Sequence, residues 1–403
     1  MADPRAPPRT SRHVLRGMLR RKEIITRVPI VTSPKTIKLA LQGGGSHGAF
    51  TWGVLDRLLE EDNLTIEGIS GTSAGAMNAA ALLQGHCKGG NQGAKESLEN
   101  FWRGVGELSP GNQNIDAPPL AAASEAWRRV LSPYQTNPLN INPLRDLLTK
   151  MLDIEAIRAW DAIKLFICAT NVENGRAHIF ERKDLTIDTL MASACLPLIF
   201  QAVNIGGTPY WDGGYTGNPA ILPLIYNCES PDVVLVQVNP LTRRGTPETP
   251  SEIINRLNEI SFNAPIISEM HAIALVQRLI ETDHLKKRWL KDIFRIFRSI
   301  LRPIFGVKAS NRSNGFVIGY PYGSEAKGMP NSEAARLKNM NIHVIGAEDQ
   351  MRALGASSRL NGGIDFLLHL KEIGRQAAGA WLMQHWQMIG ERSSVNIKQM
   401  FLD

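Results

Sequence analysis

The chain has 403 residues, of which 43% are hydrophobic and 21% are charged, and its formal net charge at pH 7 is +7. These proportions are ordinary for a globular protein and exclude a chain that is disordered throughout, and the lack of an apolar run of about eighteen residues argues against a membrane-spanning helix. We therefore expect a soluble or peripheral protein. The four cysteines have neither the spacing of a zinc site nor that of a redox pair, so we expect a reducing compartment and no metal.

The first 35 residues are predicted to be a basic, flexible arm. Residues 1–35 contain nine Arg and Lys against Asp3 and Glu23, and these charges interrupt every short apolar run, so the segment lacks the apolar core of a secretory signal. An Arg-rich start also fits a transit peptide, but a solvated arm with affinity for phosphate is the simpler interpretation. The positive charge favours an anionic partner such as a membrane surface, and we expect a cytoplasmic protein that is peripheral on the inner surface of the membrane.

Ordered structure is expected to begin at residue 36 with a strand, a glycine loop and a helix. The alternating run from Thr36 to Gln42 predicts the strand, and apolar residues at helical spacing from Ala49 to Glu61 predict the helix. Between them lies Gly43-Gly44-Gly45-Ser46-His47-Gly48, where consecutive glycines allow backbone N–H groups to turn inward and bind an anion. A dinucleotide or nucleotide site is the competing interpretation, but the loop lacks the third glycine of G-x-G-x-x-G and the Lys-Ser/Thr end of a P-loop.

The second motif is Gly71-Thr72-Ser73-Ala74-Gly75, which fits the G-x-S-x-G nucleophile elbow. A β-type run precedes it and an Ala-rich helix signal from Ala74 to Leu83 follows it, which is the context that the motif requires. Gly71 and Gly75 leave room for the tight backbone, and Ser73 is the candidate nucleophile. The chain between the two motifs has room for only one helix and one strand, so a single β-α-β unit would bring the glycine loop beside Ser73. An ordinary glycine-bounded turn is the alternative.

Residues 85–143 are predicted to be an insertion of loops and short helices. The segment is rich in Gly, Asn, Gln and Pro, and apolar residues such as Trp127 could form a lid or the wall of an acyl pocket. Surface loops with one helix packed on the core are equally compatible. After a predicted helix at 142–160, strands at 164–170 and 177–181 resume the sheet.

The candidate base is Asp212, which follows Tyr210-Trp211 and precedes Gly213-Gly214. Two glycines after an aspartate produce a tight turn with little crowding, so the carboxylate can reach a neighbouring hydroxyl. A turn aspartate that hydrogen-bonds its own backbone is the alternative. A buried strand is predicted at 233–238.

Beyond Pro240 the sequence predicts a polar linker and then helices. Residues 285–305 have a basic amphipathic pattern, in which Lys and Arg accompany Trp289 and aliphatic side chains. Such a helix could lie on an anionic membrane surface, or it could pack on the core with its basic face in solvent. No nucleic-acid motif accompanies the basic residues, so no nucleic-acid partner is expected. Residues 365–386 are predicted to be a structural helix.

These motifs, in this order, resemble those of the patatin-like phospholipases, in particular the bacterial members. GGGSHGA at 43–49 is similar to the family's glycine-rich oxyanion motif, GTSAG at 71–75 to its serine elbow, and DGG at 212–214 to its catalytic aspartate motif. The block ASACLP at 192–197 and the pair Asn218-Pro219 are similar to further family blocks. The resemblance therefore covers about residues 37–238.

The resemblance implies a three-layer α/β/α fold with a mostly parallel central sheet over residues 36–240, followed by a helical C-terminal extension over 241–403. It also implies a serine acyl hydrolase of the lipase, phospholipase A or lysophospholipase type that cleaves membrane phospholipid or another lipid acyl ester without a cofactor. In such an enzyme Asp212 accepts the proton of Ser73, and the loop at 43–48 stabilises the oxyanion. Many members carry Arg or Lys where this chain has His47, so a positive charge beside the loop is not guaranteed.

Two other functions are compatible with the sequence. An acyltransferase of the related transacylase type would pair the serine with a histidine, for which His178 is the candidate. A non-catalytic lipid-binding protein would use the basic arm and the basic helix and would have an inactive serine site.

Overall fold

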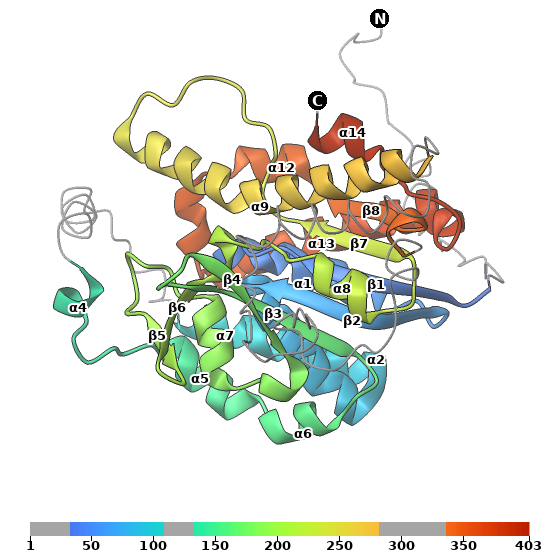
Figure 1. Ribbon diagram of the computed structural model, residues 1–403. Helices are drawn as coiled ribbons and strands as arrows, with labels where there is room; N and C mark the ends of the chain where they lie inside the picture. Colours follow the sequence, from blue (N-terminus) through green and yellow to red (C-terminus); the bar gives the residue numbers. More distant parts are fainter. Residues whose placement is uncertain (1–32, 109–131, 282–335, 403) are drawn as a thin grey trace, which may run out of the picture. The chain divides into compact units, whose positions relative to one another are not determined.

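The computed structural model describes residues 33–108, 132–281 and 336–402 (Figure 1). The predicted basic arm lies almost entirely outside the described residues, and the predicted basic helix at 285–305 lies outside them completely, as do residues 109–131 of the predicted insertion. By their contacts, the described residues from Pro34 onward form one unit.

An eight-stranded sheet forms the centre of the unit at 34–403, with the strand order β5-β6-β3-β2-β1-β7-β8 and with β4 paired to β3 outside this path. The strands are β1 (Lys35–Leu41), β2 (Leu64–Thr72), β3 (Lys164–Asn171), β4 (Arg176–Glu181), β5 (Val203–Ile205), β6 (Thr208–Asp212), β7 (Asp232–Gln237) and β8 (Asn341–Gly346). The pairs β1–β2, β2–β3, β1–β7 and β7–β8 are parallel, whereas β4, β5 and β6 form antiparallel pairs. The parallel strands are apolar because both of their faces are covered, and every residue of β7 is buried.

Helices cover both faces of the sheet, which confirms the predicted three-layer α/β/α fold (Figure 1). One face packs against α1, α2 and α13, and the other face packs against α8, α9 and α14. The helices are α1 (Gly48–Leu58), α2 (Ala74–Leu108), α4 (Pro133–Thr136), α5 (Pro143–Met151), α6 (Ile154–Ala159), α7 (Ile187–Ser193), α8 (Leu222–Asn227), α9 (Pro250–Glu281), α12 (Glu348–Ala353), α13 (Ile364–His385) and α14 (Ile397–Phe401), with 3₁₀ turns η1 (Gly45–His47), η2 (Arg182–Asp184), η3 (Gly213–Tyr215), η4 (Ala356–Leu360) and η5 (Trp386–Met388).

Residues 85–108 belong to α2, where an insertion of loops and short helices was predicted. A kink at Gly89-Gly90, whose backbone angles are not helical, divides this helix into two segments. Buried apolar side chains recur at helical spacing from Ala94 to Trp102, a signal that the high glycine content obscured. A Cβ on Gly85 would lie 2.0 Å from the carbonyl oxygen of Gly93, so these glycines allow two helical segments to approach closely and do not mark a loop.

The C-terminal part contributes a strand as well as helices. Strand β8 pairs in parallel with β7 at the edge of the sheet, and the sequence patterns did not indicate it. A histidine interrupts its apolar run, but His343 is fully buried and its Nε2 lies 2.9 Å from Oδ1 of Asp232. Helix α13 crosses α1 in close contact, since a Cβ on Gly374 would lie 2.0 Å from the carbonyl oxygen of Phe50. The extension is therefore part of the same core.

Candidate active site

Strands β2 and β6 end at neighbouring positions on β3. Strand β2 is parallel to β3 and its last residue, Thr72, is paired with Cys168, whereas β6 is antiparallel to β3 and its last residue, Asp212, is paired with Ala169. Because β4 is paired along one edge of β3, β2 and β6 must share the other edge, where they run toward each other. Ser73 follows β2 directly, so the sheet itself brings this serine to the carboxyl group of Asp212.

Ser73 occupies a strained backbone position between β2 and α2. Its φ is 54°, in the left-handed region that non-glycine residues rarely adopt. The backbone N–H of Ser73 donates to Oγ of Ser193 at 2.9 Å, and the Ser193 hydroxyl donates to the carbonyl oxygen of Cys168 at 2.7 Å. A Cβ on Gly75 would lie 2.2 Å from the carbonyl oxygen of Leu41, so only glycine fits there. The backbone thus has the strand–turn–helix geometry of a nucleophile elbow, with Ser73 at its apex.

Asp212 is fully buried at the end of β6. Its Oδ1 accepts a hydrogen bond from the backbone N–H of Gly214 at 2.7 Å, and its Oδ2 has no hydrogen-bond partner of standard geometry among the described residues. Burial raises the pKa of Asp212 to about 7, and the Gly214 N–H and the nearby Ser73 hydroxyl act in the opposite direction. A carboxylate with this pKa is a stronger base toward a hydroxyl than an exposed aspartate.

The glycine loop lies directly against Ser73. A Cβ on Gly43 would lie 2.7 Å from Cβ of Ser73, so the absence of a side chain is what permits the approach. The N–H of Gly43 donates to Oδ1 of Asn218 at 2.7 Å and is therefore occupied. The N–H groups of Gly44 and Gly45 have no acceptor in the part of the chain that the structure describes. These two N–H groups, at the start of η1, are the donors that the loop offers to an anion.

The loop's histidine is neutral. His47 is buried with Nε2 2.7 Å from Oγ of Ser358, and burial, together with the charge of Arg359, lowers the pKa of His47 to about 3. The backbone of Arg359 lies beside the loop, because its carbonyl oxygen would be 2.5 Å from a Cβ on Gly45, and the charge of its side chain is the one that acts on His47. The side chain of Arg359 donates from Nη2 to Oδ1 of Asn239 at 2.8 Å. The C-terminal part therefore supplies a positive charge that position 47 does not.

Three other predicted residues have packing roles. A Cβ on Gly48 would lie 2.6 Å from Cβ of Ala74, and one on Gly71 would lie 2.7 Å from the carbonyl oxygen of Gly75. Both glycines therefore let the surrounding backbone approach the start of α2. Ser46 is buried within η1.

His178, the alternative partner of Ser73, lies in β4. Its ring packs against the rings of Phe180 and Tyr210, with centroid distances of 4.4 and 5.3 Å, and burial lowers its pKa. Within the described ranges, no hydrogen bond joins His178 to Ser73. The geometry gives a Ser–His pair no support.

Four residues at the site were not predicted: Ser193, Asn218, Asn239 and Arg359. Ser193 and Asn218 belong to the ASACLP and Asn-Pro segments that resemble family blocks, but those segments indicated no role for either side chain. No spacing pattern connects Asn239 or Arg359 to the glycine loop, because both approach it only through the fold.

Neither a metal site nor a membrane span is found among the residues that the structure describes. No group of three or more His, Cys, Asp or Glu is placed there to hold a metal ion. No helix in those ranges is both long enough and apolar enough to cross a membrane.

The chain is similar to solved structures and to one family model. Among solved structures the chain is similar to VipD from Legionella pneumophila, with 14% sequence identity and a TM-score of 0.31 over 89% of this chain and 76% of that one. It is also similar to a chain of the ExoU–SpcU complex from the type III secretion system of Pseudomonas aeruginosa, with 16% identity and a TM-score of 0.24, and it spans only 60% of that chain. No curated protein matches the sequence. The family model for patatin-like phospholipases matches residues 39–225, which contain the glycine loop, Ser73 and Asp212, and this part of the chain is therefore a patatin-like phospholipase domain.

Proposed function

We propose that the protein is a serine acyl hydrolase that cleaves lipid acyl esters through Ser73 and Asp212, as a lipase, phospholipase A or lysophospholipase. The observation that carries this proposal is the meeting of β2 and β6 at adjacent positions of β3, which brings the hydroxyl and the buried carboxyl group together. The match to a phospholipase family supports a lipid ester as the substrate class.

The chemistry follows from these groups. Oγ of Ser73 attacks the ester carbonyl carbon while the Asp212 carboxylate accepts the hydroxyl proton, and the N–H groups of Gly44 and Gly45 stabilise the oxyanion. The tetrahedral intermediate expels the alcohol, which takes the proton from Asp212. Water then attacks the acyl-enzyme with Asp212 again accepting a proton, and the fatty acid leaves as the Ser73 hydroxyl is restored. A pKa of about 7 lets Asp212 accept and release a proton near neutral pH.

An exposed apolar surface beside the site supports a lipid substrate. Leu139, Ile141 and Leu198 are 81%, 63% and 70% exposed. Their two segments are joined, because Nε2 of Gln201 donates to the carbonyl oxygen of Asn137 at 2.8 Å. The segment of Leu198 follows Cys195, whose carbonyl oxygen accepts the Asp212 N–H at 2.8 Å. Exposed apolar side chains on segments next to a site can mark an interaction surface, and these three would contact the membrane from which the substrate is drawn.

The location follows from the same proposal. A protein that hydrolyses membrane lipid would act as a peripheral protein, and we place it in the cytoplasm at the inner surface of the membrane. Attraction to anionic lipid would come from the arm at 1–35 and the segment at 285–305, which carry the basic residues that the sequence singles out.

Covalent labelling tests the nucleophile. A fluorophosphonate probe should label the wild type stoichiometrically and should not label Ser73→Ala. Asp212→Asn should lose at least 1000-fold in kcat on a chromogenic acyl ester, whereas His178→Ala should keep most of the activity. Labelling that persists in Ser73→Ala, or loss only in His178→Ala, would overturn the proposal, the second outcome in favour of a Ser–His acyltransferase. A lipid panel with the active enzyme then identifies the head group and the bond that is cleaved.

A further inference from the structure

Both backbone polar atoms of Gly43 are bound by fully buried asparagines from two different segments. The N–H of Gly43 donates to Oδ1 of Asn218 at 2.7 Å, and its carbonyl oxygen accepts from Nδ2 of Asn239 at 2.9 Å. A glycine without this clamp could rotate its peptide planes freely, since it has no Cβ to restrict φ and ψ. The clamp therefore selects one backbone conformation for the loop.

The clamp also decides which way the next N–H points. The carbonyl of Gly43 and the N–H of Gly44 belong to one trans peptide unit, in which these two groups point in opposite directions. Asn239 holds the carbonyl on its side, so the Gly44 N–H must face away from Asn239. That N–H is the first one of the loop without an acceptor among the described residues, next to the Gly43 that touches Ser73.

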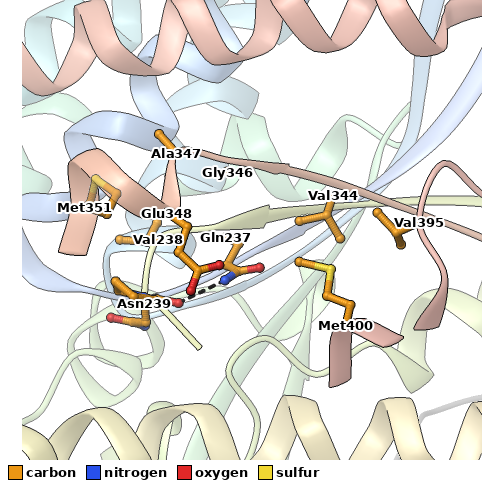
Figure 2. A pocket seen from close by; sticks show the side chains of 11 residues that line it. Gln237, Val238, Asn239, Val344, Gly346, Ala347, Glu348, Met351, Val395 and Met400 are labelled. Carbon is orange, nitrogen blue, oxygen red and sulfur yellow. Dashed lines mark hydrogen bonds between the residues drawn. The ribbon is translucent and has the colours of Figure 1, made fainter. Parts of the chain in front are cut away.

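Asn239 is itself fixed at all four of its polar groups. Its N–H donates to Oε1 of Gln42 at 2.9 Å, and its carbonyl oxygen accepts from Nε2 of Gln237 at 3.2 Å. Gln237 and Asn239 both line a cavity of about 200 Å³ beyond the end of β7 (Figure 2). Its Oδ1 accepts from Nη2 of Arg359 at 2.8 Å. A guanidinium can only donate and a carbonyl can only accept, so Arg359 and Gly43 together leave the amide of Asn239 a single orientation.

We propose that Asn239 is a positioning residue of the oxyanion hole, held by Arg359, which aims the Gly44 N–H at the ester oxygen that becomes negative when Ser73 attacks. The inference rests on the proposed hydrolase function. Both Asn239 and Arg359 lie outside the matched range of residues 39–225, so residues beyond that range complete the site. A preorganised donor acts only if it is held at the position of the developing charge, which is what this clamp supplies.

Asn239→Asp isolates the contact to Gly43. The variant keeps an acceptor for Arg359 and replaces the donor toward Gly43 by a carboxylate oxygen that repels the carbonyl. We expect kcat on a soluble acyl ester to fall roughly 100-fold, as for the loss of one oxyanion donor, with KM changed less than about threefold. Inhibition by a trifluoromethyl ketone, whose adduct with a serine carries an oxyanion, should weaken in parallel with kcat. Unchanged kcat and unchanged inhibition would overturn the proposal.

Asn227→Asp is the matched control. Its Nδ2 donates to the carbonyl oxygen of Pro223 at 2.8 Å, so the variant loses the same kind of contact away from the loop and should keep the wild-type kcat. If Asn239→Asp does not fold, Arg359→Lys and Arg359→Leu replace it. Lysine retains a donor for Asn239 and should keep more of kcat than leucine, and equal kcat in the two variants would overturn the role of Arg359.

Backbone hydrogen exchange tests the clamp without activity. Exchange in the peptide that covers residues 42–48 should be faster in Asn239→Asp than in wild type and Asn227→Asp. Unchanged exchange would contradict the proposed role of Asn239 in holding the loop, even if the enzyme is active. Faster exchange in Asn239→Asp, together with a wild-type protein that the fluorophosphonate probe never labels, would support the clamp and contradict the proposed hydrolase function.

Discussion

Oγ of Ser193 accepts the backbone N–H of Ser73 at 2.9 Å, and thereby ties the strained elbow to the end of α7. The same hydroxyl donates to the carbonyl oxygen of Cys168 in β3, so one side chain joins the backbone of Ser73 to the strand with which β6 is paired. This contact holds Ser73 at its positive φ and keeps it in register with Asp212.

Ser193→Ala should therefore affect both stability and catalysis. Two buried backbone groups lose their partner, which costs about 1–3 kcal/mol in the free energy of unfolding, and a misplaced nucleophile should lower kcat roughly tenfold with little change in KM. Urea unfolding and steady-state kinetics on a soluble ester measure the two effects. Ser230→Ala is the control, because Oγ of Ser230 also accepts a backbone N–H, from Asp232 at 3.2 Å, and donates to a carbonyl, that of Thr36 at 2.6 Å. Equal loss of kcat in both variants would contradict a specific role for Ser193.

The activity should depend on the protonation of Asp212. The carboxyl group must be ionised to accept the Ser73 proton, and burial raises its pKa to about 7. We expect kcat/KM for a soluble ester to rise with pH, to be half-maximal near pH 7 and to level off above it. His47, with a pKa of about 3, does not titrate in this range. Initial rates between pH 5 and 9 provide the check, and a flat profile across pH 6 to 8 would contradict Asp212 as the base.

The raised pKa of Asp212 also predicts how the stability of the fold depends on pH. The stability should fall as pH rises, whereas a carboxylate in an ion pair makes it rise. The folded-state pKa of Asp212 is raised from 3.8 to about 7, so between these pH values the folded state binds more protons than the unfolded state and stability falls as pH rises. Asp212→Asn removes this loss and keeps an acceptor for the Gly214 N–H. The inactive variant should therefore exceed the wild type in Tm by more at pH 8 than at pH 5.

Asp232→Asn gives the contrasting result. Asp232 is partly desolvated, but hydrogen bonds from His343, the Gly390 N–H and Asn341 lower its pKa overall. Its carboxylate therefore stabilises the fold above its unfolded-state pKa, and its replacement should lower Tm at pH 8. A gain in Tm for Asp232→Asn, or none for Asp212→Asn, would show that the two carboxylates do not differ in the way that their surroundings imply.

The exposed apolar surface beside the site should matter for membranes and not for soluble esters. The double variant Leu139→Ser, Ile141→Ser should lower the rate on phospholipid vesicles several-fold, because each serine removes apolar area that would enter the lipid interface. Activity on a short soluble ester should change less than twofold. Met383→Ser on α13 is the control, since Met383 is as exposed as Leu139, at 81%, but belongs to another part of the surface. A comparable loss on vesicles for Met383→Ser would argue against a defined lipid-binding surface.

Much of the fold could be predicted because its signals are local. The glycine loop, the elbow and the aspartate turn each lie within a few consecutive residues, where the need for glycine follows from backbone sterics alone. Alternating or apolar runs of strand length marked β1, β2, β3, β4 and β7. Strand β8 was missed because a buried histidine with a distant carboxylate partner interrupts its pattern, and the second half of α2 was missed because glycines that permit close helix contact also occur in loops.

The sequence by itself determined which residues could be the nucleophile, the base and the oxyanion loop, because these requirements are properties of short segments. Only the tertiary structure decided that β2 and β6 meet on one edge of β3, that burial raises the pKa of Asp212, and that Asn218 occupies the Gly43 N–H. It alone brought Asn239 and Arg359 to the loop. Strand register, burial and contacts between distant segments depend on how the whole chain packs, and no local pattern of residues contains that information.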